Sequence, residues 1–240
     1  WPVRNTAITR MTEGYGVGHF VGYQADGIFQ NQGEIFSHVN ADGDLLQPGA
    51  APGDIRFLDT NGDGTINSDD IADIGSPWPK HIIGLSANLT YKDFYISAKF
   101  NAQIGHEIYR TYERSDVTFS NYQSFWLGRW TAENPSTELP RLTSTDPNNN
   151  QRPSDFYLEN GNFLRLRNLQ IGWNVPAKIL EKFNMKEAKI YLTGTNRFTM
   201  TNYHGFDPDI GTSGWILDTG IDKGFYPNNR SIGAGLNVSF

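Results

Sequence analysis

The longest regular runs of alternating hydrophobic and polar residues lie near the middle of the chain. Every second residue is apolar through 83–92, and a second run of the same kind extends through 94–104. Successive side chains of a β-strand point to opposite sides of the sheet, so each run predicts a long strand with one apolar and one polar face. Lys92 and Asp93 separate the runs and predict a tight turn, and therefore an antiparallel hairpin.

The same period of two returns in SIGAGLNVSF (231–240) at the end of the chain. Weaker strands are predicted at 162–174, 188–200 and 17–29. Between two of them, the segment 176–185 begins with Pro176 and predicts a short helical turn. The pattern as a whole predicts an all-β fold.

Strand and loop lengths indicate which all-β class is present. The clearest runs last about ten to twelve residues, which is the length of a tilted transmembrane strand rather than that of an average soluble strand. The segments 106–161 and 202–229 are much longer than ordinary connections, whereas Lys92 and Asp93 form a short one. Short turns on one side and long loops on the other are typical of outer-membrane barrels. We therefore predict a transmembrane antiparallel β-barrel with long extracellular loops.

The predicted barrel has a polar inner side and a lipid-facing outer side. The residues expected toward the interior are Asn88, Thr90, Asn101 and Gln103, and those expected toward lipid are Leu85, Leu89, Ile96 and Phe100. Roughly six strands are predicted, fewer than the about eight of the smallest barrels, so we expect a piece of a longer protein. If the last strand ends in the periplasm, the segments 59–70, 106–161 and 202–229 lie outside the cell.

The segment DTNGDGTINSDD (59–70) has the spacing of a twelve-residue calcium loop. Carboxylate and amide oxygens on alternate residues converge on a hard cation, and Gly64 permits the sharp turn between them. The predicted ligands are Asp59, Asn61, Asp63, Asp70 and the backbone carbonyl of Thr65. Asp70 is shorter than the usual glutamate, which favours a weak structural Ca²⁺ site. The alternative is an Asx-rich turn that binds no metal.

Composition excludes several functions. The net charge is −6 and no basic cluster is present, which argues against a nucleic-acid partner. No apolar run approaches the about eighteen residues of a transmembrane helix. The chain contains no cysteine, and its acidic residues share loops without a rigid frame that would fix a catalytic pair. We therefore predict that the protein is not an enzyme.

Aromatic residues are concentrated in the two long loops. Tyr122 and Trp126 lie in the first loop and Trp215 in the second. Aromatic faces stack on sugar rings and on peptide side chains, so these three are candidate substrate-binding residues. The alternative is that such rings form the interfacial girdle of a barrel or pack the loops together.

Five stretches resemble one known family: VGYQADGIFQ (21–30), APGDIRFLDTNGDGTINSDDIADIGSPWPK (51–80), FLRLRNLQIGWNVP (163–176), AKIYLTGTNRFTMTNYHGFDPDI (188–210) and GLNVSF (235–240). Together they span most of the chain. The calcium-type loop, the Gly-x-Pro-x-Pro run and the strand pair after it are the most specific part. The chain resembles the C-terminal part of a SusC/RagA-type TonB-dependent outer-membrane transporter of the Bacteroidetes.

The resemblance implies a plugged barrel of about twenty-two strands in the outer-membrane lipid, of which 1–240 supplies the C-terminal part. It implies a SusD-like surface lipoprotein as a lid, TonB as the source of energy and oligosaccharide or peptide as cargo. The plug and the TonB-contacting segment are not in this chain. The predicted function is TonB-dependent import of oligomeric nutrients. Alternatives are a soluble, calcium-stabilised β-sandwich adhesin or binding module, and a barrel that binds a partner without transport.

Overall fold

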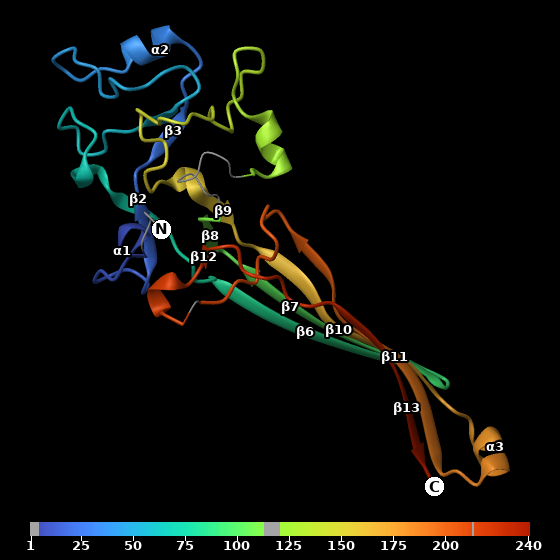
Figure 1. The fold of residues 1–240 in the computed structure, drawn as a ribbon. Coiled ribbons are helices and arrows are strands. Elements are labelled where there is room, and N and C mark those ends of the chain that lie inside the picture. Colours follow the sequence, from blue (N-terminus) through green and yellow to red (C-terminus); the bar gives the residue numbers. More distant parts are fainter. Residues whose placement is uncertain (1–4, 113–120, 213) are drawn as a thin grey trace. The chain divides into compact units, whose positions relative to one another are not determined.

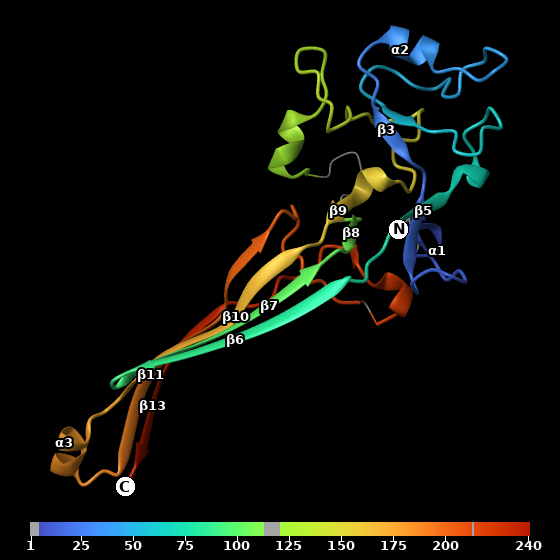
Figure 2. The same cartoon turned by 180° about the vertical axis from the view of Figure 1, so that it is seen from behind.

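A computed structural model describes residues 5–112, 121–212 and 214–240 (Figures 1 and 2). Strands predominate and helices are few and short. The strands are β1 (Thr9–Arg10), β2 (His19–Gly22), β3 (Ala25–Ile28), β4 (Ile55–Phe57), β5 (Ala72–Gly75), β6 (His81–Tyr91), β7 (Phe94–Ile104), β8 (Glu107–Arg110), β9 (Leu158–Asn160), β10 (Phe163–Asn174), β11 (Glu187–Thr201), β12 (Ile221–Asp222) and β13 (Ser231–Ser239).

Each helical element is only one or two turns long. The α-helices are α1 (Asn5–Ile8), α2 (Gln32–Ser37) and α3 (Ala177–Leu180). The 3₁₀ helices are Ser68–Asp70, Ser124–Gly128, Asp155–Tyr157, Glu181–Phe183 and Ile216–Asp218. Among the described residues, no helix has the length and apolar character needed to cross a membrane.

The chain divides into two compact units. The loop unit comprises Trp1–Pro77, Ile108–Leu158 and Gly211–Lys223, and the sheet unit comprises Trp78–Glu107, Glu159–Ile210 and Gly224–Phe240. Each unit is therefore assembled from three separate stretches of sequence. The sheet unit contains the predicted long strands, and the loop unit contains the calcium-type loop.

The sheet unit is one antiparallel sheet with the strand order β13-β11-β10-β7-β6. Its strands have 9, 15, 12, 11 and 11 residues in that order. The long strands predicted from the alternating pattern are confirmed to within two residues at each end. Within the described residues, β6 and β13 each pair on one side only, so this sheet is open at both edges.

The register confirms that the sheet has two chemically distinct faces. One cross-strand row contains Leu89, Ile96, Ile171, Leu192 and Ala234, each opposite the next. The neighbouring row, which points to the other face, contains Thr90, Tyr95, Gly172, Tyr191 and Gly235. Leu89 is 67% exposed and Leu192 is 58% exposed, so the apolar face is not covered within this chain.

Two tyrosines of the polar face lean over glycines of the neighbouring strands. A Cβ atom added at Gly172 would overlap the ring of Tyr95, and one added at Gly235 would overlap the ring of Tyr191. Glycine in a strand often marks such a close approach. Along this row, each of the two tyrosine rings therefore fills the space left by a glycine on the next strand.

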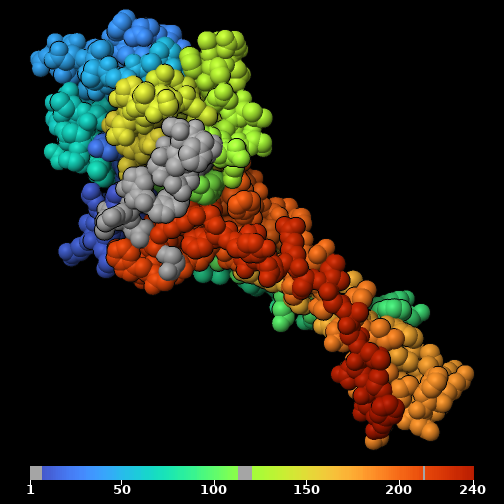
Figure 3. Space-filling view, in the orientation of Figure 1, coloured from blue at the N-terminus to red at the C-terminus, as the bar shows by residue number. Residues whose placement is uncertain are grey.

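The turns at one end of the sheet are short. Lys92, which has φ +53°, and Asp93 join β6 to β7, as the sequence predicts. The predicted helical turn between β10 and β11 is also confirmed: Pro176 is the N-cap of α3, and Asn184 ends the following 3₁₀ helix with φ +53°. Asparagine tolerates this left-handed conformation better than most residues. The C-terminal strand β13 lies beside β11 in the space-filling view (Figure 3).

The loop unit is built from small sheets around a small apolar core. Strands β1, β2 and β5 form one sheet, β3 pairs with β4, and β12 pairs in parallel with β8. The core contains Ile8, Phe20, Tyr109 and Ile221, with Ile74, Tyr157 and Leu158 packed against it. Residues far apart in the sequence thus meet in one cluster.

The weak strand predicted at 17–29 is wrong as a single element. The segment forms β2 and β3, which belong to different sheets. Between them, the amide of Tyr23 donates to the carbonyl of Pro153, and a Cβ at Gly22 would lie 2.7 Å from that same carbonyl oxygen. The alternating pattern continues through this point, but the close approach of a distant segment interrupts the strand.

A buried polar network joins the loops of this unit. The Asp54 carboxylate is fully buried and accepts two hydrogen bonds from Arg141, at 2.6 and 3.0 Å. It also accepts bonds from the Asn150 side chain and from the Ala51 amide. A buried charge is tolerated when it is paired and fully hydrogen-bonded, and Asp54 meets both conditions.

Candidate functional site

The calcium-type loop is organised by its first residue. The two Asp59 carboxylate oxygens accept hydrogen bonds from the amides of Gly62, at 2.7 Å, and Gly64, at 2.8 Å. Gly64 has φ +86°, the left-handed conformation expected at the sharp turn of such a loop. Asp59 therefore holds the first half of the loop in a closed conformation.

The next predicted ligands contact one another. Asp63 accepts hydrogen bonds from the Thr65 amide at 2.9 Å and the Thr65 hydroxyl at 2.8 Å. The side-chain amides of Asn61 and Asn67 also donate to Asp63, at 3.0 and 3.2 Å. These bonds, that of the Thr65 hydroxyl foremost, lower the pKa of Asp63 below its ordinary value. Asp63 is thus a carboxylate at neutral pH.

Asp70 closes the loop from a buried position. Its side chain accepts hydrogen bonds from the amides of Thr60, at 2.6 Å, and Asn67, at 2.8 Å. Burial raises the pKa of Asp70, but the hydrogen bonds from Asn67, Thr60 and Asn61 outweigh it, and the net pKa lies below the ordinary value. Asn67 and Asp70 also form a capping box around the 3₁₀ helix Ser68–Asp70.

The loop carries the right atoms for calcium, and the metal itself stays a prediction. All five predicted ligand residues lie on one closed loop and offer only oxygen, which suits a hard cation. In the three described stretches, no group of three or more His, Cys, Asp or Glu side chains lies close enough to hold a metal. A loop of this type also uses amide and backbone oxygens, here those of Asn61 and Thr65.

Sequence reasoning missed a second turn beside the loop. The Asn40 side chain accepts from the amides of Asp42 and Asp44 and donates to the carbonyl of Gly64. Between the two turns lies a hollow of about 380 Å³, lined among others by His38, Asp59 and Asp63. The spacing N-A-D-G-D (40–44) resembles half of a calcium loop and is the signal from which this turn could have been predicted.

The candidate substrate-binding aromatics lie in the loop unit. Tyr122 and Trp126 pack edge to face with ring centroids 5.5 Å apart. Trp126 is buried, as expected for a packing role, whereas Tyr122 is 38% exposed and Trp215 is 49% exposed. Residues 113–120 of this aromatic loop lie outside the described residues.

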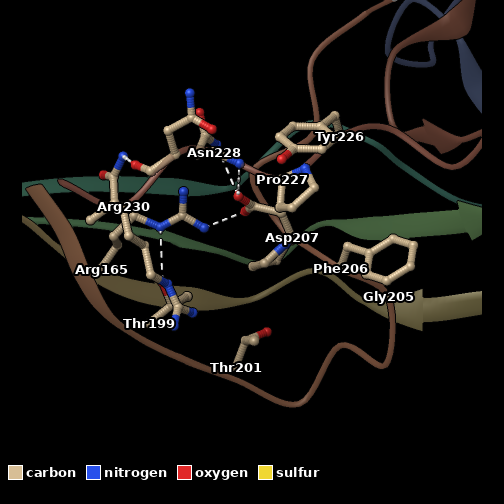
Figure 4. Close-up of a pocket in the computed structure, with 13 residues that line it drawn as sticks. Arg165, Thr199, Thr201, Gly205, Phe206, Asp207, Tyr226, Pro227, Asn228 and Arg230 are labelled. Carbon is tan, nitrogen blue, oxygen red and sulfur yellow. Dashed lines mark hydrogen bonds and ion pairs between the residues drawn. The ribbon is translucent and has the colours of Figure 1, made fainter.

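The sheet unit contains a cleft that the sequence does not reveal (Figure 4). It has a volume of about 420 Å³ and lies where β10 begins, β11 ends and β13 begins. The strands contribute Arg165, Asn196, Thr199 and Thr201 to the lining. The segments before β13 and after β11 contribute Gly205, Phe206, Asp207, Pro208, Tyr226, Pro227, Asn228, Asn229 and Arg230.

Charged groups hold the inner part of this cleft together. Arg165 is buried, donates to Asp207, and also pairs with Asp209 at 3.3 Å. Arg167 donates to the same Asp209 oxygen at 2.6 Å. Burial raises the pKa of Asp207, but hydrogen bonds from Arg165 and from the Asp209 and Asn228 amides outweigh it, so the net pKa is lowered. The network ties the long segment after β11 to the polar face of β10.

Comparison with known proteins gives the family. No protein-family model matches the chain. The TonB-dependent receptor P26 of Formosa agariphila is 33% identical over 245 residues, which cover 97% of this chain and 23% of that receptor. SusC of Bacteroides thetaiotaomicron, also a TonB-dependent receptor, is 25% identical over 223 residues, covering 92% of this chain and 20% of SusC. The chain belongs to the SusC/RagA-type TonB-dependent receptors.

The fold agrees with this assignment. The RagAB peptide importer in its open-open state matches 97% of this chain and 24% of its own chain, with a TM-score of 0.65 and 22% identity. The chain thus spans about a quarter of the length of the SusC/RagA-type proteins that it matches. The relatives are named as receptors or as an importer rather than as enzymes, in agreement with the prediction of a non-catalytic protein. They give no support to the β-sandwich alternative.

Proposed function

We propose that this chain supplies the C-terminal strands and several extracellular loops of a transporter that imports oligomeric nutrients across the bacterial outer membrane. The observation that carries the proposal is the two-faced sheet of the sheet unit. Its strands of 9 to 15 residues are long enough to cross a bilayer when tilted. One face is apolar and exposed, and the opposite face is polar.

The two faces have separate roles in the proposed transporter. The apolar row that includes Leu89, Ile96, Ile171 and Leu192 faces lipid, and the polar row that includes Thr90 and Tyr95 lines a wet interior. The open edges of β6 and β13 pair with strands of the same barrel that lie outside this chain. This pairing removes exposed backbone groups, which lipid cannot satisfy.

The proposed mechanism is gated binding rather than chemistry. A SusD-like lipoprotein covers the extracellular mouth, and TonB acts on the barrel through a segment outside this chain. Support comes from the SusC relative and from the likeness to the RagAB peptide importer. Oligosaccharides and peptides are both candidate cargoes.

Uptake by living cells tests the import proposal. The gene for the full-length protein is deleted in the source bacterium, and cells are given fluorescently labelled oligosaccharides or labelled peptides. We expect uptake of one cargo class to be lost, to return with the intact gene, and to stop when a protonophore collapses the proton gradient. Unchanged uptake of both classes in the deletion strain contradicts the proposal.

We further propose that loop 59–70 binds Ca²⁺ outside the cell, where the metal stiffens a long loop. The oxygen-only set of Asp59, Asn61, Asp63, Thr65 and Asp70 supports this, and the closed backbone reduces the ordering cost of binding. A calcium ion between carboxylates would also relieve their mutual repulsion.

Calorimetric titration of the chelator-treated full-length protein tests the calcium site. We expect binding that Asp63→Ala abolishes, because Asp63 supplies the central carboxylate of the loop. Asp69→Asn is the matched control, since Asp69 lies in the same loop, is exposed and is not a predicted ligand. Absence of binding at millimolar calcium, or equal loss in both variants, argues against the site.

A further inference from the structure

The apolar face of the sheet ends in an aromatic row at its short-turn end. Tyr91, Phe94 and Trp173 lie opposite one another on β6, β7 and β10, two residues beyond the leucine and isoleucine row of the same face. The Phe94 and Trp173 rings stack with their centroids 6.3 Å apart. Aromatic residues gather where a membrane-spanning barrel passes from hydrocarbon to lipid headgroups. The row therefore marks the headgroup level at this end of the sheet.

Lysines are concentrated just beyond the aromatic row. Five of the eight lysines of the chain lie in the two short turns or at the start of β11: Lys92, Lys178, Lys182, Lys186 and Lys189. The same stretches, 92–93 and 176–189, contain three acidic residues, so they carry a net charge of +2 in a chain of net charge −6. This end of the sheet is therefore positively charged.

Three of these lysines have no anionic partner of their own. Lys178, Lys182 and Lys186 are exposed, and no carboxylate in the described part of the chain pairs with them. Lys189, in contrast, pairs with Glu187 at 2.5 Å. The turn 176–186 thus presents three ammonium groups that can bind an anion from outside the chain.

The turn 176–186 lies on the apolar side of the sheet. Ala188 shares the apolar face with Ile190, two residues along β11, yet Ala188 is 3% exposed whereas Ile190 is 47% exposed. α3 packs against β11, and its Leu180 is buried as well. We therefore assign the cover over Ala188 to α3, which Figures 1 and 2 show at this end of the sheet. The turn thereby continues the lipid-facing surface.

The turn also exposes apolar side chains beside its lysines. Ile179 and Phe183 are four residues apart on α3 and the 3₁₀ helix that follows it, and both are exposed. Lys178 and Lys182 have the same spacing, so each pair lies on one side of the helical turn. Apolar and basic groups side by side are typical of a segment that lies in a membrane interface, with its ammonium groups at the lipid phosphates.

We propose that the turn 176–186 binds the headgroups of anionic phospholipids in the leaflet next to the short turns. Lys178, Lys182 and Lys186 pair with the phosphates, and Ile179 and Phe183 enter the boundary of the acyl chains. The inference rests on the proposed outer-membrane function, which places the apolar face in lipid, and it adds a lipid preference at one end of the sheet.

Photocrosslinking of the full-length protein in lipid vesicles tests the preference. The photoreactive amino acid p-benzoylphenylalanine replaces Phe183, and in a second protein it replaces Leu192 of the apolar face. The vesicles consist of phosphatidylcholine with a minor share of phosphatidylglycerol, and mass spectrometry identifies the crosslinked lipid. The position 183 protein is then compared with a triple Lys→Gln variant and a triple Lys→Arg variant at 178, 182 and 186. Lys80→Gln is the control at the opposite end of β6.

We expect phosphatidylglycerol at position 183 to be enriched at least about fivefold over its share of the vesicle, because each lysine near an anionic surface contributes about that factor. The triple Lys→Gln variant should lose the enrichment, and the triple Lys→Arg variant and Lys80→Gln should keep it. Circular dichroism in the vesicles checks that each variant folds; the substituted lysines are exposed.

Three results overturn the lipid preference: no lipid crosslink at position 183, lipid crosslinks there without enrichment, or enrichment that survives in the triple Lys→Gln variant. Position 192 separates this failure from that of the proposed function. A lipid crosslink at 192 with any of these three results removes the lipid preference alone. Absence of lipid crosslinks at 192 overturns both the membrane placement of the sheet and the inference that rests on it.

Discussion

At the scale of single residues, distance along the chain decides which polar contacts the sequence predicts. The ligands of the calcium-type loop lie within twelve residues, so their spacing alone brings them together. Arg165 and Asp207 are 42 residues apart and meet only through the fold. In the sequence, Arg165 resembles any polar residue of a strand, so the cleft could not be predicted.

The fully buried Asp54 and the exposed Asp26 provide a matched comparison. Asp54→Ala leaves Arg141, Asn150 and the Ala51 amide without their acceptor, and we expect a loss of about 3 kcal/mol of local stability. Asp26→Ala removes an exposed pair with Arg56 and is expected to cost less than about 1 kcal/mol. Native-state hydrogen exchange at Ile55 and Phe57 measures both. Similar exchange in the two variants contradicts the assigned difference.

The lowered pKa of Asp207 predicts a pH dependence. A carboxyl whose pKa is lower in the folded state contributes stability above its unfolded value of about 4, and this contribution is lost as the pH falls through the folded pKa. Between about pH 5 and about pH 3, the melting temperature of the full-length protein should fall more steeply for the wild type than for Asp207→Asn. Parallel curves would show that Asp207 does not carry this dependence.

At the scale of elements, the alternating pattern predicts a strand correctly when that strand pairs with the same neighbouring strands along its whole length. β6, β7 and β13 meet this condition, and their alternation gave their bounds to within two residues. The segment 17–29 does not, because Tyr23 bonds a residue of a different part of the chain and divides it into β2 and β3. The alternation shows which side chains of a strand share a face, but it does not show which segment pairs with that strand.

The cross-strand packing of tyrosine on glycine predicts the effect of adding one methyl group. Gly172→Ala drives a Cβ into the Tyr95 ring and should lower the free energy of unfolding by about 1–3 kcal/mol. Gly84→Ala is the control, because no atom lies within 4 Å of its added Cβ and the substitution removes unfolded-chain entropy. Urea unfolding in lipid vesicles measures both variants. Equal stability would mean that the ring moves aside without cost.

At the scale of the whole molecule, the sheet presents an uncovered apolar face over several strands. A soluble protein rarely exposes such a surface, whereas a bilayer covers it. The sequence predicted the two faces because each strand alternates regularly. It did not predict how the loop unit is assembled, because Ile8, Tyr109 and Ile221 come from three distant segments.

Neighbouring residues of β11 test which face meets lipid. Leu192→Arg places a charge on the apolar face and should destabilise the membrane-inserted protein by about 2–4 kcal/mol if it lies near the bilayer centre. Thr193→Arg places the same charge on the polar face and should change stability little. The measurement is unfolding of the full-length protein from lipid vesicles. Equal effects at the two positions contradict the assignment of faces.

The row of Tyr95, Gly172, Tyr191 and Gly235 has a mechanical consequence. Each ring occupies space above a glycine of one neighbouring strand, so these two strands cannot slide past each other without displacing the ring. Tyr95 thereby opposes sliding between β7 and β10, and Tyr191 opposes sliding between β11 and β13. A pulling force applied to one strand of either pair is then shared with the other strand of that pair, so that the two strands resist sliding together.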